Sequence, residues 1–369
     1  MRVMYILFSF TVGGTERLIV DICNEMVKQN NEVYLYIIND LYDTKLFENL
    51  LPDVRIICKN RPVGSKKKYR EIFEINTFCK KHKIDVIHCN SFNIPELLIV
   101  TKIFQRKIRI IYTIHGLGQF ANISKYRIFY RNYVCDSIIA ISESVKEDII
   151  NEGIIPKKIS VVYNAIDLEK FERKKYKEVV ERTHAITIGN VARIDCRQKG
   201  QDILVSAIDE LKKDYTIRCL FAGAADKEHQ HEYNELKKRA EKIESESNSQ
   251  IVFMGNVDNI PKFLESIDIF VLPSRIEGFG ISLIEAMKMN IPCVACDLNG
   301  PREIIGGEER GTLFETGNAK DLANKLRNVI ENYDVYAKKA YDAEKYVEKN
   351  YDIKNMVIKL EKIYKGDQL

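Results

Sequence analysis

The chain lacks the features of several broad protein classes. It has no apolar run near the roughly 20 residues that a membrane-spanning helix requires, and its apolar start, residues 1–10, is too short to span. No small-residue cleavage site follows that start. The formal net charge is only +4, far from the strong basic excess of a dedicated nucleic-acid binder. We therefore expect a protein that neither spans a membrane nor binds nucleic acid.

Two common nucleotide-binding motifs are also absent. Gly13 and Gly14 lie between an apolar run and a helical pattern, but the third glycine of the G-x-G-x-x-G motif is missing. No Gly-Lys-Ser or Gly-Lys-Thr occurs to form a phosphate-binding loop. Dehydrogenase and nucleoside-triphosphatase functions are therefore disfavoured. The Gly-Gly turn still allows a phosphate to approach the backbone closely at Gly14, although such pairs often serve only to close a tight turn.

The sequence contains no recognisable metal or disulfide framework. Its nine cysteines are odd in number and scattered, which favours a reducing, cytoplasmic setting. Cys293 and Cys296 form a C-x-x-C, but no second pair or nearby histidine accompanies them, so a structural role is the better interpretation. His229 and His231 lie in a charged helical stretch without a third ligand, and we expect them on a solvated face.

Length and periodicity predict two α/β domains. A chain of 369 residues with 45% hydrophobic and 30% charged residues can bury two separate cores, with a cleft between them. Short apolar runs separated by helical patterns are typical of doubly wound parallel sheets. The expected strands are residues 3–10, 32–38, 86–89, 108–114 and 137–141, then 185–191, 217–222, 251–253, 269–272 and 292–295. We set the domains at 1–164 and 165–350, with a linker near Asn164 and in the charged run after it.

The most informative segment is PSRIEGFGISLIEAM, residues 273–287. It places Glu277 and Glu285 around a glycine loop that leads into an apolar, helix-like run. Gly278 and Gly280 permit backbone conformations closed to other residues, and the amides at a helix start attract anions. Carboxylates accept hydrogen bonds from sugar hydroxyls. The segment therefore favours a site for a diphosphate joined to a sugar, with Ile281 at the helix start.

Other candidate residues follow other strands. Arg193 and Lys199 come after the first strand of the second domain, where two fixed cations would stabilise a departing diphosphate. His115, in TIHG, ends a strand of the first domain, where an imidazole can meet a sugar hydroxyl. Surface solvation is the alternative for the two cations, and simple packing is the alternative for the histidine.

These motifs resemble those of the retaining, nucleotide-sugar-dependent glycosyltransferases of family 4, which have the GT-B fold. The resemblance covers both domains and includes the glutamate pair, the Arg-Lys pair and TIHG, although Ala192 and Ile194 replace the usual neighbours of the arginine. It implies that Glu277 holds the transferred sugar, that Glu285 holds the ribose, and that residues 351–369 pack back on the first domain. With them we place Gly278, Phe279 and Val257 at the donor sugar and nucleoside.

The resemblance also implies the substrates. The donor would be a nucleoside diphosphate sugar, with UDP the commoner choice among relatives, and the acceptor a lipid-linked saccharide of capsule or O-antigen synthesis. No D-x-D occurs, so we expect no metal and no other cofactor. Basic and aromatic residues in 59–70 and 125–133 favour reversible contact with an anionic membrane surface, with a solvated loop as the alternative. Two further functions stay open: a sugar-nucleotide-binding subunit without turnover, and a nucleotide-sugar epimerase.

Overall fold

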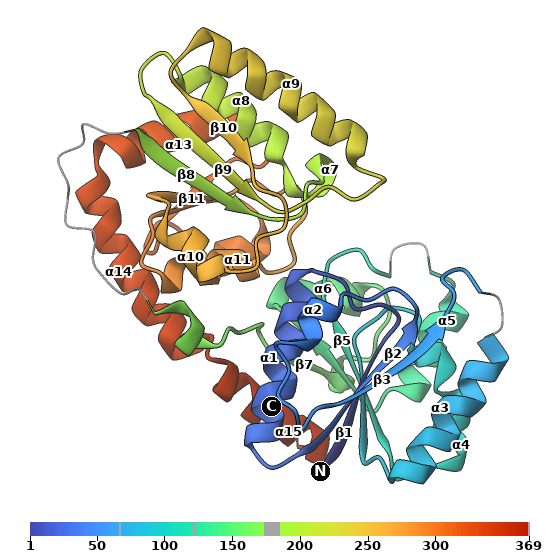
Figure 1. The fold of residues 1–369 in the computed structure, drawn as a ribbon. Coiled ribbons are helices and arrows are strands. Elements are labelled where there is room, and N and C mark those ends of the chain that lie inside the picture. The colour runs from blue at the N-terminus through green and yellow to red at the C-terminus, as the bar shows by residue number, and fades with distance from the viewer. Residues whose placement is uncertain (66–67, 121–122, 173–184, 368–369) are drawn as a thin grey trace. The chain divides into compact units, whose positions relative to one another are not determined.

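The computed structural model describes residues 1–65, 68–120, 123–172 and 185–367, and it forms two compact units (Figure 1). Unit 1 comprises Met1–Asn164 and Ile353–Leu369, and unit 2 comprises Ala165–Asp352. The second boundary lies two residues beyond the expected 350, because the Ile166 amide donates to the Tyr351 carbonyl at 3.0 Å. Most of the charged run expected as a linker, residues 173–184, lies outside the described residues.

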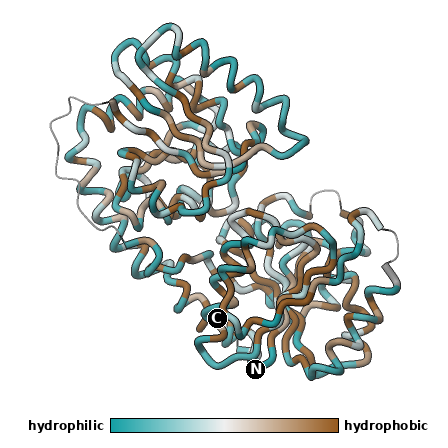
Figure 2. Tube along the Cα trace, in the orientation of Figure 1, coloured by the Kyte–Doolittle hydropathy of each residue, from teal (hydrophilic) through white to brown (hydrophobic). Residues whose placement is uncertain are grey.

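Unit 1 contains a parallel sheet with the strand order β3-β2-β1-β4-β5-β6-β7. Its apolar strands form the centre of the unit, and more hydrophilic helices surround them (Figure 2). The strands are β1 (Arg2–Leu7), β2 (Glu32–Asn39), β3 (Arg55–Arg61), β4 (Val86–Cys89), β5 (Arg109–Ile114), β6 (Ser137–Ala140) and β7 (Ile159–Val161).

Helices cover both faces of this sheet. Figure 1 shows α3 and α4 on one side of it and α1 and α15 on the other. Helix α1 buries the apolar stripe of Leu18, Ile22, Cys23 and Met26, as its periodicity predicts. The helices are α1 (Gly14–Lys28), α2 (Thr44–Phe47), α3 (Lys68–His82), α4 (Ile99–Phe104), α5 (Lys125–Val134), α6 (Glu143–Asn151) and α15 (Ile353–Lys365), with short 3-10 turns η1 (Pro95–Leu97) and η2 (Pro156–Lys158).

Helix α15 completes unit 1, as the resemblance implies. Helix α15 packs against α1, and its Tyr364 lies at the centre of a buried hydrogen-bond chain. The Tyr364 hydroxyl is 2.8 Å from the Tyr5 hydroxyl and 2.6 Å from Nδ1 of His88, whose Nε2 is 2.6 Å from the Thr113 hydroxyl. These bonds join the C-terminal helix to β1, β4 and β5.

Unit 2 repeats the architecture with a parallel sheet of order β10-β9-β8-β11-β12-β13. Helices α8, α9 and α13 pack in one row, while α11 packs on α14. The strands are β8 (Ile186–Val191), β9 (Ile217–Ala222), β10 (Gln250–Phe253), β11 (Ile269–Leu272), β12 (Cys293–Cys296) and β13 (Thr312–Phe314). The helices are η3 (Leu168–Phe171), α7 (Cys196–Lys199), α8 (Gln201–Leu211), α9 (Gln230–Glu246), α10 (Ile260–Glu265), α11 (Ile281–Lys288), α12 (Asn299–Ile305), α13 (Ala319–Glu331) and α14 (Tyr333–Asn350).

The two doubly wound sheets confirm the predicted fold class, with local differences. Strand β1 ends at Leu7 rather than at Phe10, which turns away to bridge Tyr42. Strands β3, β7 and β13 are absent from the prediction. Strand β3 is a half-exposed edge strand with several cations, and β7 and β13 have only three residues each, so none contains a long apolar run.

Candidate active site

The candidate site of unit 2 lies at the switch point of its sheet. From β8 the chain runs outward to β9 and β10, and from β11 it runs the other way to β12 and β13. At such a point the loops after two neighbouring parallel strands diverge, and ligands of open α/β sheets bind in the crevice. Residues 192–200 follow β8, and residues 273–280 follow β11. The first loop contains Arg193 and Lys199, and the second contains Glu277.

Lys199 and Glu277 meet across these two loops. The Lys199 Nζ atom lies 3.0 Å from Oε2 of Glu277, and the Ser274 hydroxyl donates to the same oxygen at 3.3 Å. The two charged side chains are 24% and 15% exposed. The two loops therefore hold a cation and a carboxylate side by side, and both side chains are partly accessible.

Arg193 is held near this pair by two neighbours on its own loop. Its Nη2 atom donates to Oδ2 of Asp195 at 3.0 Å and to Oε1 of Gln198 at 3.1 Å. Asp195 is buried and also caps α7 by accepting from the Gln198 amide at 3.0 Å. The guanidinium is about half exposed, so it is oriented by protein groups and still accessible to an anion.

His229 also lies beside Asp195, which corrects the prediction of a solvated face. Its Nε2 atom is 3.6 Å from Oδ2 of Asp195, and its Nδ1 atom is 2.6 Å from Oδ1 of Asp226. The side chain is only 18% exposed, whereas His231 is exposed as expected. The two positions differ because His229 precedes α9 and faces the loop after β8, a proximity that sequence spacing does not reveal.

A clamp that sequence reasoning missed fixes the two loops together. Arg275 makes a bidentate ion pair with Asp202, with N–O distances of 2.6 and 2.7 Å. Its backbone amide donates to the Gln198 carbonyl at 2.8 Å. Gly200 permits this approach, since it has φ +66° and a Cβ there would lie 2.0 Å from the Pro273 carbonyl oxygen. The Lys-Gly pair was the available signal, because the glycine after Lys199 marks a close backbone contact.

The glycine loop before α11 has the expected form. Gly280 precedes the helix with φ 108°, in the left-handed region that favours glycine. Gly278 is approached by Gly300 of α12, where a Cβ would lie 2.7 Å from the Gly278 carbonyl oxygen. Ile281 is the first residue of α11, so its amide belongs to the set that an α-helix leaves without an intrahelical partner.

Phe279 and Glu285 are placed differently from each other. The Phe279 ring is 2% exposed and packs edge-on against Tyr351 with centroids 5.4 Å apart. The side chain of Phe279 therefore belongs to the core, and the contact of this residue with the donor stays a prediction. Glu285 is half-buried in the second turn of α11.

Val257 lies in a loop that joins the same edge of the sheet. The Gly223 amide after β9 donates to the Gly255 carbonyl at 2.7 Å, and the Ala224 amide donates to Oδ1 of Asn256 at 3.1 Å. These bonds tie the loop after β10, which includes the half-buried Val257, to the loop after β9.

The remaining predicted residues, Gly14 and His115, belong to unit 1. Gly14 is exposed and is the first residue of α1 after β1. Gly13 before it is the N-cap residue and has an extended backbone, with φ −161°. His115 follows β5 at the corresponding edge of the unit 1 sheet.

The hydrogen bonds around His115 define its tautomer. Nδ2 of Asn90 donates to the His88 carbonyl at 3.4 Å, so Oδ1 of Asn90 faces Nε2 of His115 at 3.1 Å. Nε2 is then the donor, which leaves a lone pair on Nδ1. Nδ1 is buried and has no hydrogen-bond partner among the described residues. Burial lowers the imidazole pKa to about 4, so His115 is neutral near pH 7 and able to accept a hydrogen bond.

The described residues contain neither a cluster of metal ligands nor a helix that could span a membrane. Within 1–65, 68–120, 123–172 and 185–367, no three His, Cys, Asp or Glu side chains are grouped closely enough to hold a metal ion. Cys293 and Cys296 are free thiols buried in β12, and burial raises the pKa of each well above its usual value. No helix in the described part of the chain is long and apolar enough to cross a bilayer.

Family models match nearly the whole chain. The model for "Glycosyltransferase Family 4" matches residues 12–170, and the model for "Glycosyl transferases group 1" matches residues 171–350. The chain is similar to the capsular polysaccharide biosynthesis glycosyltransferase CapM of Staphylococcus aureus, with 25% identity over 91% of this chain and 90% of that one.

Another relative and a solved structure show the same similarity. The UDP-Gal:alpha-D-GlcNAc-diphosphoundecaprenol alpha-1,3-galactosyltransferase of Escherichia coli is 23% identical over 75% of this chain and 74% of its own. The crystal structure of Anabaena HepE in complex with UDP and glucose has a TM-score of 0.84, 19% identity, and coverage of 99% of this chain and 100% of that one. By its sequence and its GT-B fold, the chain belongs to the group 1 glycosyltransferases.

Proposed function

We propose that this glycosyltransferase is a retaining enzyme that moves a sugar from UDP to a lipid-linked saccharide in the synthesis of a capsule, an O-antigen or another cell-surface polysaccharide. The observation that carries the proposal is the meeting of Lys199 and Glu277, 3.0 Å apart, at the switch point of unit 2. In the proposed complex, Lys199 would contact the diphosphate and Glu277 a hydroxyl of the sugar.

The leaving group would be held by fixed positive charge. Cleavage of the bond between the sugar and UDP leaves negative charge on the diphosphate, and Arg193 and Lys199 stabilise that charge without reorganising. The amides of Gly280 and Ile281 add partial positive charge at the start of α11. The expectation that no metal is required rests on these cations and on the missing D-x-D, and it remains part of the proposal.

In the proposed mechanism, retention results because the acceptor hydroxyl attacks from the face that the leaving group vacates. The acceptor oxygen bonds to the anomeric carbon as the bond to the diphosphate oxygen breaks, and that oxygen takes the hydroxyl proton. No protein nucleophile is needed. In this scheme Glu277 accepts hydrogen bonds from the transferred sugar, Glu285 accepts them from the ribose, and the neutral His115 accepts one from a sugar hydroxyl.

The UDP donor and the lipid-linked acceptor are supported by relatives. The E. coli relative is named for a UDP-galactose donor and a diphosphoundecaprenol-linked acceptor, and HepE binds UDP and glucose in its crystal structure. Val257 and its loop would lie against the nucleobase, with backbone atoms making the contact.

Reversible contact with an anionic membrane surface is part of the proposal, and α5 is the surface that we assign to it. Tyr126, Phe129 and Tyr133 are 72%, 70% and 53% exposed on this helix, and Lys125 is exposed beside them. The expected basic character of residues 125–133 is corrected, because Arg131 is fully buried and Arg127 is ion-paired with Glu96. Apolar and aromatic insertion would therefore contribute more than charge. The other expected segment, 59–70, lies partly outside the described residues.

Product analysis tests the function. The protein would be incubated with UDP-glucose, UDP-galactose, UDP-N-acetylglucosamine and GDP-mannose, and each would be scored for thermal stabilisation and for slow donor hydrolysis. The donor so identified would then be offered with a diphosphate-linked lipid saccharide, and the anomeric configuration of the product determined by NMR. Retained configuration is expected. Stabilisation without turnover would favour a binding subunit, and a changed sugar still attached to UDP would identify an epimerase.

A further inference from the structure

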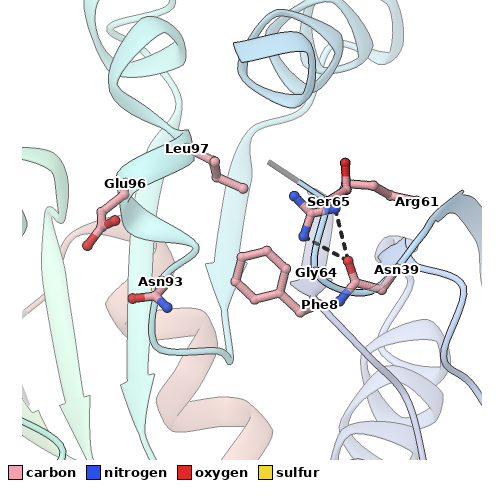
Figure 3. Close-up of a pocket in the computed structure, with 8 residues that line it drawn as sticks. All are labelled: Phe8, Asn39, Arg61, Gly64, Ser65, Asn93, Glu96 and Leu97. Atoms are coloured by element: carbon pink, nitrogen blue, oxygen red, sulfur yellow. Dashed lines mark hydrogen bonds between the residues drawn. The ribbon is translucent and has the colours of Figure 1, made fainter. Parts of the chain in front are cut away.

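Unit 1 contains a pocket at its own switch point, between β1 and β4. Its volume is about 420 Å³, and it lies where the carboxyl ends of four neighbouring strands meet. Phe8 follows β1, Asn39 and Arg61 end β2 and β3, and Asn93 and Glu96 come after β4. Figure 3 shows Arg61 and Asn39 on one side of Phe8, with Asn93 and Glu96 on the other.

Arg61 is oriented in this pocket by neutral groups. Its Nε and Nη2 atoms donate to Oδ1 of Asn39 at 3.0 and 2.8 Å, and its guanidinium carbon lies 5.4 Å from the centroid of the Phe8 ring. In the described part of the chain, Arg61 has no carboxylate within 4.0 Å. The bonds to Asn39 use two of the five N–H donors, so both donors of Nη1 and one of Nη2 remain for a ligand.

The residues opposite Arg61 in the pocket, Asn93 and Glu96, do not neutralise its positive charge. Glu96 accepts from Nε of Arg127 at 2.7 Å and lies 3.7 Å from Arg131, so its carboxylate is already neutralised by two guanidinium groups. Asn93 is likewise occupied, because its Oδ1 accepts from Nη2 of Arg127 at 2.6 Å. The buried carboxyl of Glu71 lies within electrostatic range of Arg61 without forming an ion pair to it; burial raises the pKa of this carboxyl, and the charge of Arg61 acts to lower it. Among the described residues that line the pocket, Arg61 is therefore a cation that is oriented by hydrogen bonds and has no ion pair.

We propose that this pocket is an oxyanion subsite for the acceptor, in which Arg61 binds a phosphate or carboxylate group of the molecule that receives the sugar. The inference rests on the proposed function, since it assigns a chemical class to the acceptor of that reaction. Asn39 occupies the guanidinium edge formed by Nε and Nη2. The edge formed by Nη1 and Nη2 then presents two parallel N–H groups, which match two oxygens of a phosphate or carboxylate. His115 follows the adjacent strand β5, so the subsite lies at the same sheet edge as the predicted sugar contact.

Binding measurements with small probes test the assignment. The full-length protein would be saturated with UDP and then titrated with geranyl diphosphate, methyl glucuronide or methyl glucoside by calorimetry. We expect geranyl diphosphate or methyl glucuronide to bind and methyl glucoside not to bind. Binding of geranyl diphosphate would identify a lipid diphosphate as the source of the oxyanion. Binding of methyl glucuronide would identify an acidic sugar as that source. Arg61→Gln should weaken that binding at least about tenfold, as expected for loss of a charged hydrogen bond, and Arg61→Lys less.

Arg55 provides a matched control on the same strand. It also stacks on an aromatic ring, with its guanidinium carbon 5.1 Å from the Tyr34 centroid, but it is paired with Glu32 and does not line the pocket. Arg55→Gln should leave the affinity for the probe unchanged. Equal affinity in Arg61→Gln and the parent, or no binding of either anionic probe, would overturn the subsite. Failure of the proposed donor site is distinguishable from failure of the subsite. In the first case the parent protein would not bind UDP, and in the second it would bind UDP but no anionic probe.

Discussion

The Nζ atom of Lys199 lies 3.0 Å from Oε2 of Glu277, although the two residues are on separate loops. The contact forms because β8 and β11 are neighbours in a parallel sheet and both loops leave its carboxyl edge. Replacing Glu277 by Gln keeps the shape but removes the charge that would orient the sugar. We expect turnover to fall by roughly 10², as misplacement of a substrate does, with most UDP affinity retained. Unchanged turnover would refute the assigned role, and Glu241→Gln on the exposed face of α9 is the control.

Arg193 and Arg197 form a matched pair for testing the diphosphate site. Arg193 is oriented by Asp195 and Gln198, whereas Arg197 is 86% exposed and paired with Glu232. Arg193→Gln should weaken UDP binding by roughly 10- to 100-fold, the range for a hydrogen bond to a charged group. Arg197→Gln should change it little. Calorimetric titration with UDP measures both, and similar losses in the two variants would indicate general electrostatic attraction instead of a defined site.

Two buried histidines should make unit 1 sensitive to acid. Burial lowers the pKa of His115 to about 4 and that of His88 to about 3, both below the usual 6.5. As the pH falls below about 6.5 the unfolded chain takes up these protons first, so the free energy of unfolding decreases until the pH reaches the folded-state values. Between pH 7.5 and pH 5 each histidine should contribute a loss of about 2 kcal/mol.

Urea unfolding at the two pH values measures this loss. In His115→Gln, the free energy of unfolding should fall by about 2 kcal/mol less between the two pH values than in the parent. His231→Gln, at an exposed position, should leave this pH dependence unchanged. An identical pH dependence in His115→Gln and the parent would contradict the assignment.

The Tyr364 hydroxyl should contribute measurably to stability. Tyr364→Phe removes the partner of both the Tyr5 hydroxyl and Nδ1 of His88 in a buried environment. Leaving buried polar groups unsatisfied costs about 1–3 kcal/mol, so a loss of that size is expected in the free energy of unfolding. Tyr341→Phe in α14 is the control, because that side chain is 44% exposed. Equal stabilities for the two variants would show that the chain of bonds is energetically neutral.

The exposed aromatic face of α5 predicts membrane binding that depends on Phe129. Sedimentation with liposomes that contain an anionic lipid should recover the parent protein at low salt. Phe129→Ser should reduce the bound fraction, because the apolar area available for insertion is smaller. Phe73→Ser in α3, at a residue 60% exposed, controls for a general change in surface hydrophobicity. A parent protein that stays in the supernatant would argue strongly against membrane contact.

The central strands of both units were predictable from sequence, because they are continuous apolar runs bounded by polar residues. Strands β4, β9 and β11 begin and end at the predicted residues. Edge strand β3 was not predictable in this way, since its exposed face carries Arg55, Lys59 and Arg61 and hides the apolar pattern. Short apolar runs identify strands that are buried on both faces of the sheet, and they miss strands with one face exposed to solvent.

The candidate site was predictable in residue type but not in contacts. Glu277 and Lys199 could be placed at one sheet edge from motif positions, and the glycine after Lys199 indicated a close backbone contact, yet no sequence pattern indicated that Arg275 pairs with Asp202. His229 was misjudged for the same reason, because Asp195 is its neighbour only in space. Phe279 shows that a residue within a predicted functional motif can also pack into the core through its side chain.

The hydrogen bonds from Tyr364 to Tyr5 and His88 have a consequence for biosynthesis. Helix α15 follows the whole of unit 2 in the chain, so the core of unit 1 closes only after Ile353–Lys365 has left the ribosome, when unit 2 has already been translated. During elongation the apolar surface of α1 that later receives α15 stays uncovered, so a nascent chain of this enzyme presents a natural binding surface for a chaperone.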